Sequence, residues 1–449
     1  IQGVYAGGTI NVTGNSSVGV YTEVPTRPVL NGGTDDHGLT NTSGNTVGTE
    51  TVEVSGNITV SGTGSSGVYA KEEGSITLKD NGTSDKINVT GTKSYGAVLD
   101  GIKLNLEENT EINVTGKESI GYVLKKGTGS NKGKIEVTGP ATNIATTPSL
   151  GFYGNQGTFT NEEEGKIYSS GTVAHAVALA GDTTGITFNN KGEIKTAGAG
   201  NIGVYADGKY TFNHSGNHAV INAGTDTVGI YAKNADGTLN IKAPINIANS
   251  GTGTSIGIYS DGNAKVKFGD NSKFTIGVGA VGIYSSDVTK FNETFEVETS
   301  AGKSLEVELG QNSTFGLLNG NSGNVSVGSY LNKGNNNNVK ITNFGTGASV
   351  FYATGGVTAN LDQDYTISIP TVVTNDSTSV LVGTKGSTVK IDTGKTLETN
   401  TNIGLIATKG TGTGAAASTA QNDGTIKSTR DSGIGIYTSE STGNSTGTI

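Results

Sequence analysis

One short motif recurs along the chain and limits the folds that it can adopt. Its pattern is a β-branched residue, Gly, an aliphatic residue, Tyr, and then Ala or another small residue. The clearest copies are Gly67-Val68-Tyr69-Ala70, Ile202-Gly203-Val204-Tyr205-Ala206, Val228-Gly229-Ile230-Tyr231-Ala232, Ile256-Gly257-Ile258-Tyr259-Ser260, Val281-Gly282-Ile283-Tyr284-Ser285 and Ile434-Gly435-Ile436-Tyr437-Thr438. From Gly203 to Gly282 the copies are 26, 28 and 25 residues apart. A period of this size, with no helical pattern inside it, indicates a β-solenoid.

Each period contains two further apolar-polar-apolar triplets. One precedes the motif, as in Ile112-Asn113-Val114, and one follows it, as in Tyr210-Thr211-Phe212. Alternation of this kind directs neighbouring side chains to opposite faces of a strand. Gly, Asn, Ser and Asp fill the segments between triplets, as turns require. The chain is therefore predicted to be all-β: a right-handed parallel β-helix, with three short strands per coil and about fifteen coils, forming one unit over residues 1–449.

In such a fold each strand pairs with its counterparts one coil above and below, at about 4.8 Å. Inward aliphatic side chains stack on copies of themselves, and each contributes about 1.5–3 kcal/mol when buried. We expect the motif glycine to follow a tight bend where a Cβ would clash or force an unfavourable φ. Five motif tyrosines are expected to form a structural ladder along one side, and an exposed stripe that stacks on sugar rings is the alternative: Tyr69, Tyr205, Tyr231, Tyr259 and Tyr284.

Composition narrows the possible functions. The chain has 72 Gly and only 32% hydrophobic residues, which suits a long, thin core. It has no Cys, so disulfides and thiolate metal sites are excluded. The net charge of −9 and the two isolated arginines, Arg27 and Arg430, argue against nucleic-acid binding. No apolar run has the length of a membrane span, and Ile1 to Ile10 lack the pattern of a signal peptide. We expect an internal piece of a longer chain.

The longest interruption of the repeat runs from residue 22 to about residue 52. It contains Arg27, Asp35, Asp36 and His37, a combination of charged groups that is unusual for this chain. These four residues are the candidate partner-binding site. The alternative is that the segment covers one end of the solenoid or forms a poorly matching coil.

Several other features suggest chemistry but have simpler explanations. His214 and His218 have the spacing of zinc ligands on a helix, but turn residues separate them. Residues 32–36 weakly resemble calcium-binding glycine-rich repeats but occur only once, and residues 162–164 are expected to be a solvated acidic turn. Acids that alternate with aliphatic residues over 296–298 and 305–309 are predicted to line an outward, repulsive face, with calcium or a cationic partner as the alternative. We predict no catalytic residue, no metal and no cofactor.

The repeated GVYA and GIYA signature alternates with strands such as Ile87 to Gly91 and Ile112 to Gly116. Over essentially the whole chain this pattern resembles type V autotransporter passengers, and it is most similar to the very large fusobacterial outer-membrane adhesins. The resemblance implies a signal sequence, a β-helical stalk and a C-terminal membrane β-barrel that anchors the protein at the cell surface. Neither end element is expected within these residues. The passenger itself is expected to lie outside the membrane and to be monomeric.

Three functions follow as expectations. The favoured one is a surface adhesin that attaches to host cells or to other bacteria through a protein or glycan receptor. A passive stalk that presents a binding tip elsewhere is the main alternative. A polysaccharide lyase or hydrolase is the third, because pectin lyases and related hydrolases share the β-helix. Such enzymes need clustered carboxylates, or calcium with a basic residue, and scattered acids with two arginines do not favour them. We therefore expect no enzymatic activity.

Overall fold

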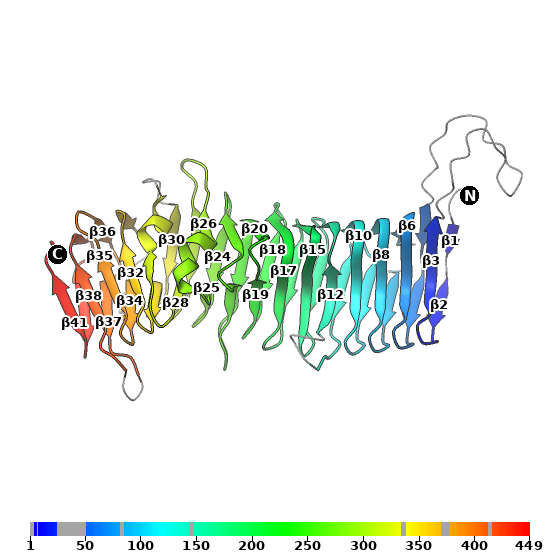
Figure 1. The fold of residues 1–449 in the computed structure, drawn as a ribbon, viewed down its shortest axis with the longest axis horizontal. Coiled ribbons are helices and arrows are strands. Elements are labelled where there is room, and N and C mark those ends of the chain that lie inside the picture. The colour runs from blue at the N-terminus through cyan, green and yellow to red at the C-terminus, as the bar shows by residue number, and fades with distance from the viewer. Residues whose placement is uncertain are drawn as a thin grey trace, which may run out of the picture.

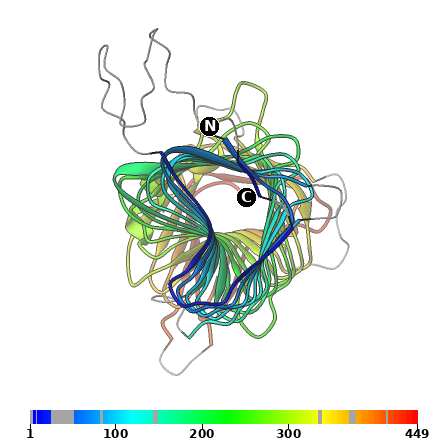
Figure 2. The same ribbon diagram turned by 90° about the vertical axis from the view of Figure 1, so that its right-hand side faces the viewer.

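The computed structural model describes residues 4–6, 8–24, 51–80, 85–142, 148–333, 338–369, 378–411 and 415–449. The chain is a β-solenoid of parallel coils stacked into a rod (Figure 1). Viewed along its length, the coils lie over one another around a common axis (Figure 2). Every pairing between described strands is parallel, so the predicted parallel β-helix is confirmed.

Each coil has three faces, which we number in chain order. Face 1 carries the motif, and its strands are β3 (Val18–Val24), β6 (Ser66–Leu78), β8 (Tyr95–Leu106), β10 (Ile120–Asn131), β12 (Ser149–Gly154), β15 (Ala174–Asn190), β17 (Ile202–Ser215), β19 (Val228–Ala232), β22 (Ile256–Ser260), β25 (Val281–Ser285), β28 (Thr314–Asn319), β31 (Ser349–Thr354), β34 (Ser379–Thr384), β37 (Ile403–Thr408) and β40 (Ile434–Ser439).

Face 2 follows face 1 in each coil, and five of the strands above, β6, β8, β10, β15 and β17, continue into it. Its other strands are β1 (Val4–Ala6), β4 (Thr51–Val54), β13 (Gly157–Asn161), β20 (Gly237–Lys242), β23 (Lys265–Phe268), β26 (Phe295–Val297), β29 (Asn324–Ser326), β32 (Thr358–Leu361), β35 (Thr388–Ile391), β38 (Thr419–Asn422) and β41 (Thr442–Ser445).

Face 3 completes the coil. Its strands are β2 (Thr9–Val12), β5 (Asn57–Val60), β7 (Lys86–Val89), β9 (Glu111–Val114), β11 (Lys134–Val137), β14 (Lys166–Ser169), β16 (Glu193–Thr196), β18 (Val220–Ala223), β21 (Pro244–Ile247), β24 (Lys273–Ile276), β27 (Leu305–Leu309), β30 (Val339–Phe344), β33 (Tyr365–Ile367), β36 (Thr396–Thr399) and β39 (Thr425–Ser428). Twelve of these pair in one run and three in a second, so the described faces 1 and 3 each have fifteen levels, as the repeat predicts.

The core runs the length of the rod and consists of the inward half of each triplet. Ile112 and Val114 are fully buried, for example, whereas Asn113 between them is only partly covered. Aromatic side chains fill the core in places: Phe152, Phe159 and Phe188 contact one another with ring centroids 4.3–5.3 Å apart. Because each level covers the apolar face of the next, stability depends on the stack and not on single coils.

The motif glycine is required by close approach of neighbouring coils. A Cβ on Gly203, Gly229 or Gly257 would lie 2.5–2.6 Å from the backbone oxygen of the glycine one level on. None of these glycines has a positive φ. The expected clash is therefore found, but the expected backbone strain is not. Ala176 occupies this column between Gly151 and Gly203, so one level accommodates a methyl group.

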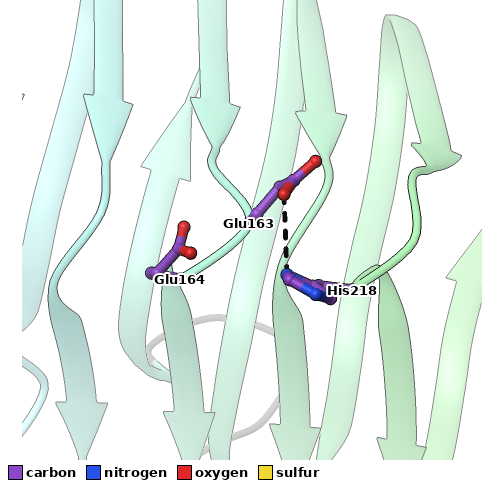
Figure 3. A group of neighbouring side chains, drawn as sticks. All are labelled: Glu163, Glu164 and His218. Atoms are coloured by element: carbon purple, nitrogen blue, oxygen red, sulfur yellow. Dashed lines mark ion pairs between the residues drawn. The ribbon is translucent and has the colours of Figure 1, made fainter.

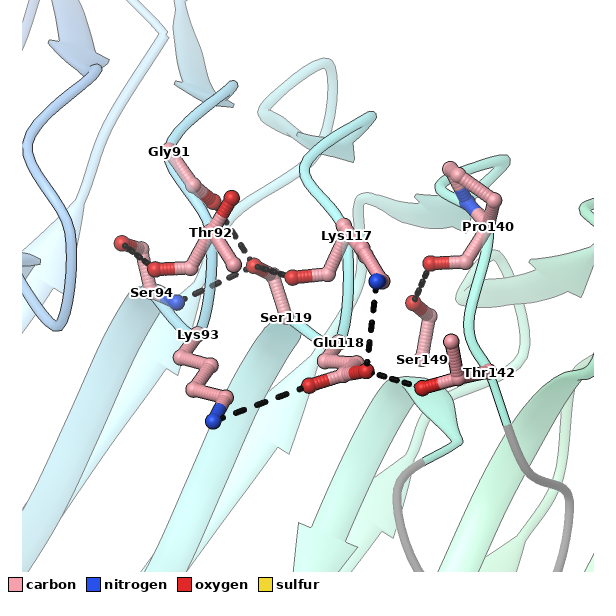
Figure 4. A network of polar contacts seen from close by, with 10 residues as sticks. All are labelled: Gly91, Thr92, Lys93, Ser94, Lys117, Glu118, Ser119, Pro140, Thr142 and Ser149. Carbon is pink, nitrogen blue, oxygen red and sulfur yellow. Dashed lines mark hydrogen bonds and ion pairs between the residues drawn. The ribbon is translucent and has the colours of Figure 1, made fainter.

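A column of serines shapes the corner between faces 3 and 1 (Figure 4). The Ser94 hydroxyl donates to the Gly62 carbonyl at 2.7 Å, and Ser119 repeats the contact one level on with Gly91 at 2.8 Å. The Ser94 backbone N–H in turn donates to the Ser119 hydroxyl at 3.0 Å. These bonds satisfy buried backbone groups where the chain bends, and they tie each corner to the next.

The regular stack is interrupted near two short helices. Among the described residues, the helical elements are η1 (Val288–Lys290), α1 (Phe291–Thr294) and α2 (Val327–Leu331). On face 2 the pairing stops at β26 and resumes at β29, and on face 3 it stops at β30 and resumes at β33. The Asn292 side chain bonds both backbone groups of Ser326, at 2.8 and 3.0 Å, and so takes the place of a missing neighbouring strand. We call residues 286–369 the junction.

Candidate functional site

The sequence-predicted partner site lies outside the described residues. Arg27, Asp35, Asp36 and His37 all belong to residues 25–50, between the end of β3 and the start of β4. The partner-binding role of these four residues and the proposed insertion over residues 22–52 stay predictions.

The motif tyrosines lie on the outer side of face 1 in one register column. Tyr205, Tyr231, Tyr259 and Tyr284 are successive, with ring centroids 5.5, 4.7 and 5.0 Å apart. Tyr69 is in the same column, stacks on Tyr21 at 5.7 Å, and is separated from Tyr205 by four levels. Those levels carry Val98, Val123, Tyr153 and Ala178. Between Tyr205 and Tyr259 the ring planes are within 13° of parallel, so the rings cover one another's faces. Stacking on a sugar needs a free face, and this geometry favours a structural role.

The two histidines that have zinc-like spacing point to different environments. His214 is buried: its Nε2 donates to the Pro244 carbonyl at 3.0 Å, and its Nδ1 accepts from the Asn190 amide at 3.0 Å. Burial lowers the pKa of His214 to about 4, so the ring is neutral near pH 7. Both ring nitrogens are engaged, and His214 is not available to a metal.

His218 instead lies beside the acidic turn that follows β13 (Figure 3). Its Nδ1 is 3.6 Å from a carboxylate oxygen of Glu163, and donor atoms of Glu163, Glu164 and His218 all lie within 4.8 Å of one another. All three side chains are exposed. Metal sites orient their histidines by hydrogen bonds from a surrounding shell, whereas the His218 and Glu163 side chains are 60% and 50% exposed to solvent. The group fits the solvated turn predicted from sequence.

A groove on face 2 is the strongest candidate for a functional site. Its floor is one register column that crosses five levels of β15, β17, β20, β23 and β26: Asn189, Asn213, Asn240, Lys267 and Glu296. Four steps of about 4.8 Å give a length of about 19 Å. The Asn213 amide donates to Asn189 at 2.8 Å, and the Asn240 amide donates to Asn213 at 2.8 Å. These side chains alternate with the inward core residues, which is why they all face outward.

Paired charges occupy the other end of the column, where it enters the junction. Lys267 contacts Glu298 at 2.9 Å, and Lys333, which follows α2, contacts Glu296 at 2.8 Å. The hydrogen bond from Lys333 lowers the pKa of Glu296, and the hydrogen bond to Glu298 raises the pKa of Lys267. Both acids were expected to form a repulsive face, but lysines from neighbouring levels neutralise them.

Two adjoining hollows make up the groove, and Lys267 lines both. The hollow over the amides has a volume of about 450 Å³ and is lined by Asn189, Asn213, Ser215, Asn240, Lys242, Lys267, Gly269 and Glu298. The hollow beside the junction has a volume of about 500 Å³ and is lined by Lys265, Val266, Lys267, Asn292, Glu293, Thr294, Phe295, Glu296, Val297, Ser329, Tyr330 and Lys333. Pockets for small drug-like ligands are mostly apolar and enclosing. The hollow over the amides is mainly polar, whereas the hollow at the junction also exposes apolar surface. An open trough of this length suits an extended ligand better than a small, enclosed one.

Sequence reasoning did not find this groove. Its floor residues are 24–29 positions apart and belong to five triplets of ordinary composition. The one available signal was the alternation around Glu296 and Glu298, which located the acids on an outward face but not their lysine partners.

Comparison with known proteins agrees with this architecture. Residues 70–284 match the model of a family described as the BigA third pectate lyase-like domain, a domain of a bacterial surface protein. The chain is similar to a surface-protein β-helix. The match ends at Tyr284, just before the junction. No curated protein and no solved structure matches the chain.

Within the part of the chain that the structure describes, no helix is long and apolar enough to cross a membrane.

Proposed function

We propose that this chain is a non-catalytic adhesive segment of a bacterial surface protein, an autotransporter passenger that attaches to host cells or to other bacteria. The observation that carries the proposal is the groove on face 2, an open trough of two adjoining hollows that reaches the junction. The similarity of residues 70–284 of the chain to a surface-protein domain supports an extracellular location.

The charges in the groove support binding without catalysis. A glycosidase general acid needs a carboxyl group with a raised pKa, opposite a second carboxylate. Glu296 has a lowered pKa because Lys333 donates to it, and Glu298 is paired with Lys267. Glu296 and Glu298 therefore serve as partners for lysines, an arrangement that suits recognition better than proton transfer. The third acid, Glu293, lines only the hollow at the junction.

A passive stalk is the second candidate, and the regular pairing over most of the rod favours it. Labelled chain covering residues 1–449 should bind epithelial cells or partner bacteria saturably, and unlabelled chain should compete. A chain that lacks residues 23–51 is the matched variant for the sequence-predicted site, and equal binding by both forms would remove that segment from the contact surface. Absence of saturable binding to every cell type would favour the stalk.

A hydrolytic or lyase activity is tested on the same material. Incubation with a panel of soluble polysaccharides should leave their size distribution unchanged. Shortened chains that depend on the presence of the protein would contradict the non-catalytic proposal.

A further inference from the structure

The geometry points to a ligand class for the groove: an uncharged, linear oligosaccharide that lies along the rod axis over the amide column. This inference rests on the proposed adhesive function and names the chemistry of its receptor. It is carried by three observations: the unused hydrogen-bonding capacity of the amides, the internal neutralisation of the lysines, and the shape of the trough.

The amide column offers regularly repeated neutral donors and acceptors. A side-chain amide has two N–H donors and an oxygen that accepts two hydrogen bonds. Asn213 uses one N–H toward Asn189 and one lone pair for Asn240 within the column. One donor and one acceptor of Asn213 therefore remain for a ligand. A sugar hydroxyl both donates and accepts, so it can use both, whereas a carboxylate or sulfate can only accept.

The charges in the trough argue against a polyanion. Lys267 and Lys333 are each held by a glutamate at 2.9 and 2.8 Å. On the rim, Lys242 and Lys265 add two positive charges and Glu293 adds one negative charge. A polyanion would have to compete with these carboxylates for the paired lysines, and the groove carries little net charge to attract it.

The shape of the trough selects a linear ligand. The two hollows adjoin at Lys267 and together follow one column of the stack, for about 19 Å from Asn189 to Glu296. At the far end α1 and α2 line the wall through Asn292 and Ser329. A ligand that reaches both hollows must be extended along the axis and must pass over the Lys267–Glu298 pair.

The test compares two amides of one coil that differ in whether they line the groove. Asn240 lines it, whereas Asn246, on face 3, makes an equivalent bond to Asn222 at 2.9 Å and lines neither hollow. Both are half-buried and outward-facing, where Val suits a strand, so Asn240→Val and Asn246→Val should fold equally well. Circular dichroism and thermal midpoints of both variants check this.

The probes are cellohexaose and hexa-N-acetylchitohexaose, with hexagalacturonate and a heparin hexasaccharide as charged counterparts, measured by calorimetry on the whole chain. We expect at least one uncharged probe to bind, with affinity nearly unchanged by salt. Asn240→Val should lower that affinity about tenfold, and Asn246→Val by less than twofold. Binding of the charged probes alone, equal losses in the two variants, or no binding of either uncharged probe would overturn the inference.

The outcome separates this inference from the proposed function. Saturable attachment to cells that Asn240→Val leaves intact would retain the adhesin and reject the groove as its sugar site. Oligosaccharide binding in the groove without attachment to any cell would retain the sugar site and reject the adhesin.

Discussion

The regular part of the rod, from β7 to β25, and the junction over residues 286–369 solve the same packing problem differently. In the regular part the glycine column lets neighbouring coils approach, and most of its levels repeat the motif. In the junction the register places Phe315 and Val350 in that column, and Val380 occupies it one level beyond the junction. All three side chains are fully buried. At these levels a large side chain occupies the position where, in the regular part, the backbone of the next coil lies close to a glycine.

This difference explains where the groove lies. Identical levels give a straight surface with paired neighbours, as the amides of Asn189, Asn213 and Asn240 illustrate. Where pairing on face 2 stops at β26, the helices α1 and α2 take the place of strand contacts and line one end of the trough. The regular stack of strands therefore forms the floor of the groove, and the helices at the junction form the wall at one end.

The largest expected effect distinguishes how the two parts unfold. Phe291 is fully buried and contacts Phe295, Tyr330 and Phe351 with centroids 5.0–5.9 Å away, so Phe291→Ala should lower the free energy of unfolding by about 3–5 kcal/mol. Hydrogen exchange should show lost protection confined to η1, α1 and α2, which have no ladder partners. Phe159→Ala, in the regular part, is the control and should cost as much while exposing strands. Loss of protection along the whole rod in Phe291→Ala would contradict the distinction.

The next effect concerns pH and the regular part alone. His214 is neutral when folded, with its pKa lowered to about 4, while the unfolded chain has a His pKa near 6.5. The unfolded state therefore takes up a proton first as pH falls, so stability is complete above about pH 6.5 and is lost toward pH 4, by about 3 kcal/mol.

His214→Asn tests this, because Asn would extend the buried column of Asn131, Asn161 and Asn190 that ends at His214. Urea unfolding at pH 7 and at pH 4.5 should show a smaller loss in the variant than in the natural chain. Equal losses would mean that His214 is not the group that titrates.

Adding one methyl group to the glycine column should have a smaller effect. The Cβ of Gly229→Ala would meet the Gly257 oxygen at 2.6 Å, and relieving that contact should cost about 1–3 kcal/mol. The natural Ala176 in the same column implies the lower part of this range. Equilibrium unfolding in urea measures the cost, and an unchanged midpoint would show that neighbouring coils are not in close contact at the motif.

The smallest effect compares tyrosines of the two parts. Tyr231 stacks on Tyr205 and Tyr259, whereas the register neighbours of Tyr352 are Leu317 and Val382. Tyr231→Leu should therefore cost more than Tyr352→Leu, by about 0.5–1.5 kcal/mol for each aromatic pair that is lost. Urea unfolding of both variants measures the difference. If the two variants lose the same free energy of unfolding, ring stacking does not contribute to stability.

The fold of the regular part could be predicted from the sequence, because in a parallel stack each repeated triplet pairs with the same triplet of the next coil. The triplets around Ile112 and Ile245 became strands with the predicted alternation because each lies on its own counterpart. The junction could not be predicted: α1 and α2 are four and five residues long, too short for a helical period, and depend on contacts such as Asn292 with Ser326. The groove was missed for a related reason, since it depends on which residues are one coil apart.

Cross-linking tests the stacking register most directly, because the chain has no natural Cys. Thr187 and Thr211 are 24 residues apart and are register partners on face 2, whereas Thr211 and Asn222 are 11 apart and lie on different faces. Adjacent strands lie about 4.8 Å apart, within the Cα separation of about 4.4–6.8 Å that a disulfide spans. The Thr187→Cys, Thr211→Cys pair should oxidise rapidly to an intramolecular disulfide, and the Thr211→Cys, Asn222→Cys pair should not. Cross-linking of the second pair but not the first would contradict the parallel stack.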